Sequence, residues 1–211
     1  MGEDGNRGVR RYPEISESRE MVKKSTGMEQ EVCQLKVTLR GIRPAIWRRL
    51  VVSADTTLTR LHRVLQIAMG WQDSHMHEFR VDDRRPAGLG SAQMGRSARI
   101  GDVLTEMGSS LTYTYDLGDG WEHTIVLEKR FCGSDDTEYP VCLDGRQACP
   151  PEDSGGVPGY YDLLEVLQNP ADERYEEMRK WIGEDFDPRA FSVEAVNRQL
   201  RSGRPRRRSS T

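Results

Sequence analysis

The sequence has no long apolar run, and this absence excludes a membrane-spanning helix. No stretch approaches the roughly 18 consecutive apolar residues that a bilayer span requires. The N-terminus also lacks the apolar central region of a secretory signal. We therefore expect a cytoplasmic protein that does not contact a membrane.

Cysteine is scarce, and several motifs of well-known enzymes are missing. The four cysteines are Cys33, Cys132, Cys142 and Cys149. In a reducing compartment they are expected to be free thiols or metal ligands rather than a disulfide framework. No G-x-S-x-G nucleophile motif and no Walker lysine occurs, so neither an α/β-hydrolase nor a P-loop nucleotide site is indicated.

Charge is distributed unevenly along the chain. The net charge is -3, and residues 201–211 contain five arginines and no acid, so the chain without them carries -3 - 5 = -8. An acidic body argues against general nucleic-acid binding. The tail predicts a weak contact with phosphate backbones, and the alternative is a disordered, solubilising end. The arginines expected to make the contact are Arg204, Arg206, Arg207 and Arg208.

Three segments are expected. Residues 1–29 are polar, show no apolar period and are predicted to be disordered, with Met28 as an alternative start. Residues 30–200 form one domain, and residues 201–211 form a basic disordered tail.

Within the domain, apolar periodicity predicts strands, helices and loops. Strands are expected at 33–42, 45–53, 77–82, 111–117 and 123–129, the last two as a hairpin. Helices are expected at 54–71, 99–109, 160–168, 172–183 and 192–200, and loops at 82–98 and 139–159. This order predicts an α+β fold: a mixed sheet that packs on one helix, with a long hairpin and a helical C-terminal part.

Several stretches resemble the plasmid pRiA open-reading-frame-three-like family. They are QLKVTLRGIRPAIWRRLVV, GWQDSHMHEFRV, YTYDLGDGWEHTIVLEK, YPVCLDGRQACPPEDSGGVPGYYDLLEVL and GEDFDPRAFSVEAVN, between about residues 32 and 200. The resemblance implies a β-grasp-like sheet and an association with plasmids and mobile elements, where members are labelled as insertion-element passengers or TnpR. The resolvase activity that TnpR suggests is not carried over, because no stretch matches a resolvase serine or a helix-turn-helix. Family members commonly have cysteine where this chain has Ser154, which would remove a soft metal ligand.

Histidines, cysteines and carboxylates predict a metal site for zinc or another divalent ion. His75 and His77 are two residues apart, so on a strand both side chains would lie on one face. The alternative is that both histidines cap the helix–strand turn and bond to the backbone. Cys142 and Cys149 have six residues between them, unlike the C-x2-C pairs of a zinc ribbon. The full candidate set is His75, His77, Asp119, His123, Cys142 and Cys149.

The stretch YDLGDGWEH at residues 115–123 has two interpretations. Asp116 and His123 are candidates for an orienting carboxylate and a general base. We favour a structural hairpin turn, in which Gly118 and Gly120 adopt positive φ and a tryptophan packs beneath. The residues that would line a pocket beside the turn are Trp71, Trp121 and Glu122.

Two functions remain open on the sequence. The first is a non-enzymatic binding or interaction module with an unknown protein partner, stabilised by a metal or not. The second is a metal-dependent, nuclease-like hydrolase that uses the histidines and aspartates around the hairpin. The acidic body favours the first, because a nuclease usually presents a basic surface to phosphates. The residues of the second hypothesis are His75, His77, Asp116, Asp119 and His123.

Overall fold

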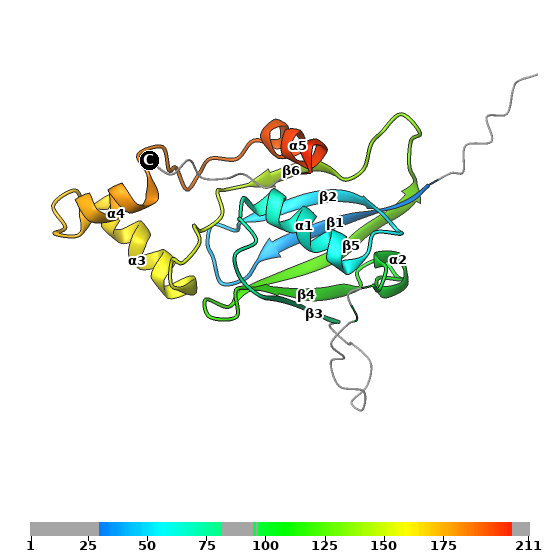
Figure 1. The fold of residues 1–211 in the computed structure, drawn as a ribbon, viewed down its shortest axis with the longest axis horizontal. Helices are drawn as coiled ribbons and strands as arrows, with labels where there is room; N and C mark the ends of the chain where they lie inside the picture. Colours follow the sequence, from blue (N-terminus) through cyan, green and yellow to red (C-terminus); the bar gives the residue numbers. More distant parts are fainter. Residues whose placement is uncertain (1–29, 82–94, 96, 204–211) are drawn as a thin grey trace, which may run out of the picture.

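The computed structural model describes residues 30–81, 95 and 97–203 (Figure 1). The expectations for residues 1–29, including the alternative start at Met28, lie outside the described residues, as does most of the loop expected at 82–98. The same holds for the arginines of the basic tail, which are Arg204, Arg206, Arg207 and Arg208.

A six-stranded sheet forms the centre of the domain, in the order β3-β4-β5-β1-β2-β6. Every neighbouring pair is antiparallel, which confirms the α+β class but shows that the sheet is not mixed. A parallel pair would need a crossover connection that returns the chain to the same end of the sheet, and no neighbouring strands here are joined in that way. The strands are β1 Glu31–Leu39, β2 Trp47–Ser53, β3 His77–Val81, β4 Ser110–Tyr115, β5 Trp121–Cys132 and β6 Val141–Arg146.

The two faces of the sheet differ because side chains alternate along each strand. On β5, residues 121, 123, 125 and 127 are buried, whereas residues 122, 124, 126 and 128 are partly exposed. The partly exposed face carries ion pairs, such as Arg49 with Glu128 at 2.7 Å. The buried face forms the hydrophobic core together with helix α1 (Leu58–Met69).

Helix α1 lies across the buried face of the sheet, as the apolar stripe predicts (Figure 1). The Thr57 side chain caps its N-terminus by accepting a hydrogen bond from the backbone N–H of Arg60. Gly70 ends it with φ 95°, a conformation that glycine adopts without a steric penalty. The short helix α2 spans Ile100–Val103.

The C-terminal part is helical, as expected. Helices α3 (Gly156–Gln168) and α4 (Tyr175–Ile182) contact each other and extend from one end of the sheet, whereas α5 (Val193–Ser202) lies beside β6 (Figure 1). Ser192 caps α5 by accepting from the backbone N–H of Ala195. Helix α3 begins at Gly156, four residues before the predicted start at 160.

The prediction of a continuous loop at 139–159 was wrong, because β6 lies within it and pairs with β2. Asp144 and Gly145 made the segment look like a loop, since strands are depleted in both residue types. Gly145 is required here: a Cβ at this position would lie 2.5 Å from the Phe191 ring. Among the described residues, no helix is both long and apolar enough to cross a membrane.

Candidate metal centre

Three loops meet at one end of the sheet. They are residues 70–76 between α1 and β3, residues 116–120 between β4 and β5, and residues 147–155 between β6 and α3. Backbone N–H groups join the loops: Asp116 donates to the Met76 carbonyl at 2.9 Å, and Gln72 donates to Glu152 Oε1 at 2.8 Å. Asp119 Oδ2 accepts from the N–H of Gly155 at 3.1 Å. These bonds hold the acidic side chains of different loops close together.

The hairpin turn at 116–120 is built by Asp116. Its Oδ1 accepts from the N–H groups of Gly118 and Asp119, at 2.9 and 3.3 Å, and its carbonyl accepts from Gly120. Positive φ occurs at Asp116 (55°) and Gly120 (68°); Gly118, for which it was also predicted, does not adopt it. Asp116 thus uses one carboxylate oxygen for the turn, which leaves Oδ2 for another contact.

Asp116 Oδ2 faces His75, and two more carboxylates do the same. His75 Nε2 lies 3.2 Å from Asp153 Oδ1, 3.6 Å from Glu152 Oε2 and 3.7 Å from Asp116 Oδ2. This nitrogen is buried and has no hydrogen-bond partner. Four side chains from three loops therefore surround one small volume without bonding to one another there.

Tyr115 holds two of these groups in position. Its hydroxyl accepts from the N–H of Ser74 at 3.0 Å and donates to Glu152 at 3.1 Å, and its ring meets the His75 ring edge-on. Burial raises the pKa of Tyr115 above its ordinary value, so the hydroxyl keeps its proton and remains a donor. The Tyr115 hydroxyl also lies 3.2 Å from Glu152 Oε2, so Tyr115 orients both carboxylate oxygens of Glu152, of which Oε2 faces His75.

The spacing of these atoms fits a shared metal ion. Nitrogen and oxygen ligands bind first-row divalent metals at about 2.0–2.2 Å, which places tetrahedral ligand atoms about 3.4 Å apart. The three distances from His75 Nε2 bracket this value. His75, Asp116 and Asp153 have ligand atoms all within 4.8 Å of one another, with Glu152 adjacent.

Backbone conformation and charge support the same conclusion. Asp116 and Asp153 both adopt positive φ, 55° and 56°, which costs free energy for a non-glycine residue and is concentrated at functional sites. Among the residues that the structure describes, no lysine or arginine ion-pairs with Asp116, Glu152 or Asp153. In the described part of the chain, the three neighbouring carboxylates therefore face one imidazole and no lysine or arginine.

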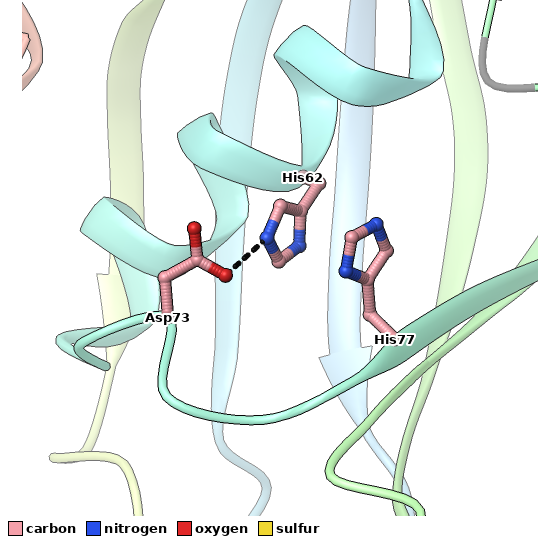
Figure 2. A group of neighbouring side chains, drawn as sticks. All are labelled: His62, Asp73 and His77. Carbon is pink, nitrogen blue, oxygen red and sulfur yellow. Dashed lines mark hydrogen bonds and ion pairs between the residues drawn. The ribbon is translucent and has the colours of Figure 1, made fainter.

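A second histidine cluster lies beside the first, formed by His62, Asp73 and His77 (Figure 2). His62 on α1 uses both ring nitrogens: Nε2 is 2.7 Å from Asp73 Oδ1, and Nδ1 is 2.8 Å from the Tyr113 hydroxyl. Its ring stacks on that of His77, with centroids 3.5 Å apart and an interplanar angle of 9°. One ion cannot lie in the planes of two parallel rings, so this cluster is a packed hydrogen-bond network.

The structure separates the residues of the predicted metal site. His75 and His77 belong to different clusters, because β3 begins only at His77 and the alternation rule does not reach His75. Asp119 bonds to the backbone of Gly155. His123 is fully buried behind the hairpin.

The two cysteines of the predicted set also lie elsewhere. Burial raises the pKa of Cys142 to about 11 and that of Cys149 to about 12, so both remain protonated thiols, whereas a metal binds the thiolate. All four cysteines of the chain are free. Ser154 uses its hydroxyl to donate to the Pro151 carbonyl.

The acid–base pair predicted at Asp116 and His123 does not form. His123 Nδ1 lies 3.2 Å from the Tyr113 carbonyl, and Nε2 is buried without a partner. Burial lowers the pKa of His123 to about 4, so the ring is neutral near pH 7. The side chain is part of the core, and Asp116 bonds to its own turn.

The structure also places the residues of the predicted pocket apart from one another. Trp71 and Trp121 are each only 1% exposed, and Trp71 Nε1 donates to the Pro150 carbonyl at 3.0 Å. Glu122 points to the opposite face of β5, where it pairs with Arg40 and Arg80. Strand alternation alone separates Trp121 from Glu122, and that signal was available in the sequence.

Sequence reasoning missed Glu152 and Asp153, and it also missed His62 and Asp73. The first two lie in a Pro- and Gly-rich stretch that is typical of a turn, which hid their role. His62 follows Leu61 on the apolar side of α1, and a histidine at a buried helical position is a usable signal.

A single antiparallel sheet crossed by one helix, with three acidic loops gathered at one end, defines an α+β domain with a candidate metal centre. The sequence pattern of the plasmid pRiA4b ORF-3-like proteins matches residues 31–195, and the chain belongs to this family. This confirms the resemblance seen in the sequence.

Two relatives place the chain within the family. It is 40% identical over 180 residues to the uncharacterized protein y4hQ of Sinorhizobium fredii, covering 82% of this chain and 92% of that protein. It is similar to the crystal structure of a protein of unknown function from Methanosarcina mazei Go1, with a TM-score of 0.72 and 36% identity. That match covers 78% of this chain and 97% of the archaeal one.

Proposed function

We propose that this chain is a binding module whose three converging loops are fastened by one divalent metal ion. His75, Asp116 and Asp153 are its ligands, and Glu152 supplies a fourth carboxylate. The observation that carries the proposal is the buried, unpartnered Nε2 of His75 among three carboxylate oxygens. One imidazole with carboxylates suits zinc or manganese.

The main effect of the ion would be to stabilise the structure. Its ligands come from three loops, and it would neutralise carboxylates that have no lysine or arginine partner among the described residues. Because the ion would bind the folded chain and not the unfolded one, binding adds directly to the stability of the fold. Free cysteines suit a reducing compartment, so we place the protein in the cytoplasm.

Metal content tests the proposal. Chelator-stripped protein is loaded with Zn²⁺ or Mn²⁺, dialysed and measured by elemental analysis. The wild type should retain about one ion per chain, as the four-ligand geometry implies. The Asp116→Asn/Asp153→Asn variant should retain none.

The matched control is Asp73→Asn, which makes the same change in the second histidine cluster. It should retain the ion as the wild type does. The assignment would be refuted if the wild type retained no metal. It would also be refuted if the double variant kept the metal and the control lost it. Circular dichroism of each variant separates loss of the ligands from loss of the fold.

We further propose that the partner is a protein that docks over these loops. Met76 and Leu117 follow His75 and Asp116 directly, and their side chains are 71% and 50% exposed. Exposed apolar groups next to a rigid site are typical of an interaction surface. Capture of a partner protein should therefore weaken in Met76→Ser/Leu117→Ser and also in Asp116→Asn/Asp153→Asn, which lacks the metal. Unchanged capture in both variants would contradict this docking proposal.

A metal-dependent hydrolase is the second candidate, favoured by one observation. The Asp153 side chain is 72% exposed, so a metal here would keep a coordination position open to water, as catalytic sites do. The buried, neutral His123 counts against it, because it cannot serve as the base. Metal-dependent cleavage of single- or double-stranded DNA, absent in Asp116→Asn/Asp153→Asn, would establish this function; no cleavage would leave the binding module.

A further inference from the structure

A groove of about 810 Å³ lies between the β1–β2 turn, helix α3 and residues 186–189. None of its lining residues belongs to either histidine cluster. This volume is in the range of about 300–1,000 Å³ that small-molecule sites occupy. The groove is therefore a separate candidate binding site, whose lining shares no residue with the histidine clusters.

Hydrogen bonds fix these walls in place. The Tyr161 hydroxyl on α3 accepts from the N–H of Arg43 at 2.8 Å. The N–H of Ala148 donates to the Pro188 carbonyl at 3.0 Å. The groove is therefore formed in advance, which reduces the entropy lost when a ligand binds.

Gln147 is the residue that indicates a ligand. Its side chain lines the groove and is nine-tenths buried, yet it has no hydrogen-bond partner among the described residues. Its amide atoms are not among the buried polar atoms that lack a partner, so they are accessible from the groove and available to a ligand there. Its backbone also has φ 66°, a conformation that is costly for glutamine and is concentrated at ligand sites.

The rest of the groove combines an apolar wall with a basic rim. The apolar residues are Ile42, Ile46, Tyr160, Leu164, Leu167 and Phe186. Three arginines and two acids also line it. Arg43 and Arg189 have no ion-pair partner in the described part of the chain, and Arg179 donates to the Phe186 carbonyl at 3.3 Å. The acids are Glu165 and Asp187, and Asp187 Oδ1 already accepts from the N–H of Arg189.

We propose that this groove binds a small organic anion, with an apolar body against α3 and one carboxylate or phosphate group between Arg43 and Arg189. Gln147 would bond to a polar atom of the same molecule. Guanidinium groups recognise such anions through paired, charge-assisted hydrogen bonds. The inference does not rest on the metal centre, so binding should be the same in the presence of a chelator.

Amide NMR with 4-phenylbutyrate and its neutral analogue 4-phenylbutyramide tests this. Both probes should shift the Gln147 side-chain amide, and the acid should bind at least about tenfold more tightly, the effect of one charge-assisted contact. The Arg43→Gln/Arg189→Gln variant should bind both probes equally. Arg63→Gln/Arg201→Gln removes the same charge from α1 and α5, outside the groove, and should keep the preference.

Gln147→Gly separates a binding role from a structural one. Glycine accepts the positive φ, so the melting temperature should stay the same or rise. Affinity for both probes should fall, because the amide is lost. Shifts that avoid the groove, or equal affinity for acid and amide in the wild type, would overturn the proposal. No binding of either probe up to its solubility would overturn it as well.

Discussion

Two histidine clusters lie side by side at the loop end of the sheet, and each contains at least one aspartate with positive φ close to an imidazole. In the His62 cluster, His62 has both ring nitrogens bonded and its ring stacked. In the His75 cluster, His75 Nε2 is surrounded by carboxylates at 3.2–3.7 Å and makes no hydrogen bond. Both clusters are built from imidazole and carboxylate groups, but the ring nitrogens of His62 are hydrogen-bonded whereas Nε2 of His75 is not.

This difference shows that residue types do not define a metal site. A site needs lone pairs that converge on one point and remain available. Stacked rings cannot provide this, whereas side chains from three loops can. The following experiments test the contrast, from the largest expected effect to the smallest.

Removing His62 should be the most damaging change. His62→Ala leaves a cavity beside the stacked His77 ring and removes a partner of the buried Tyr113 hydroxyl. We expect a loss of about 3–4 kcal/mol in the free energy of unfolding, measured by urea denaturation in chelator. His75→Ala under the same conditions should cost less than about 1 kcal/mol, because its Nε2 makes no bond and the side chain is 28% exposed. Equal losses would remove the contrast between the clusters.

Adding metal should affect only the His75 cluster. At a free metal concentration about 100 times the Kd, the wild type should gain about 2.7 kcal/mol. For a domain of this size that corresponds to roughly 5–10 °C in Tm, measured by calorimetry. Asp116→Asn/Asp153→Asn should show no gain, and Asp73→Asn should show all of it. A gain that depends on Asp73 would reverse the assignment.

Lowering the pH should show how His123, which is in neither cluster, affects the free energy of unfolding. Its pKa is about 4 in the folded chain, lowered by burial, against about 6.5 when unfolded. Stability is therefore unaffected above pH 6.5. It falls by about 1.4 kcal/mol per pH unit below that, or about 2 kcal/mol by pH 5, because only the unfolded chain takes up the proton.

Urea titrations of wild type and His123→Leu in chelator, over pH 5–8, give this slope by difference. The other three histidines are common to both proteins, so they cancel. Parallel pH profiles for the two proteins would show that His123 is not held neutral by the fold.

The smallest expected change in stability comes from substitutions that separate the two roles of Asp116, which are to form the hairpin turn and to bind the metal. Asp116→Asn keeps a side-chain oxygen for the turn and tolerates positive φ, so stability without metal should change by less than about 0.5 kcal/mol. Asp116→Ala loses the bond from Gly118 and should cost about 1–2 kcal/mol. Both variants should lose the ion. Equal stability of the two would mean that Oδ1 does not support the turn.

Much of the fold followed from the sequence because burial imposes simple periods. The alternation of β1 and β5 and the apolar stripe of α1 each reflect one buried face. The predicted hairpin and the helical C-terminal part were confirmed for the same reason. Strand β6 was missed because its pairing with β2 is a tertiary contact, and its own residues are typical of a loop.

The candidate site was only partly predictable, because it depends on loops. His75 and Asp116 were candidates on the sequence, but Asp116, Glu152 and Asp153 lie 41, 77 and 78 positions after His75, since 116 - 75 = 41, 152 - 75 = 77 and 153 - 75 = 78. No local period links such positions. Trp71 and Trp121 were placed in a pocket because aromatic residues serve both pockets and cores, and only packing distinguishes the two.

The spacing of the ligands has a consequence for the chain as a polymer. A bound ion would join residues 75, 116 and 153 and so close two loops of 41 and 37 residues, since 116 - 75 = 41 and 153 - 116 = 37. Such a cross-link would hold the three loops together in the folded chain, and it would have to open before they could separate. Unlike a disulfide, it would open reversibly with metal supply and without any reductant. The lifetime of the folded state would then depend on the residence time of the ion, and the rate of proteolysis would measure that lifetime.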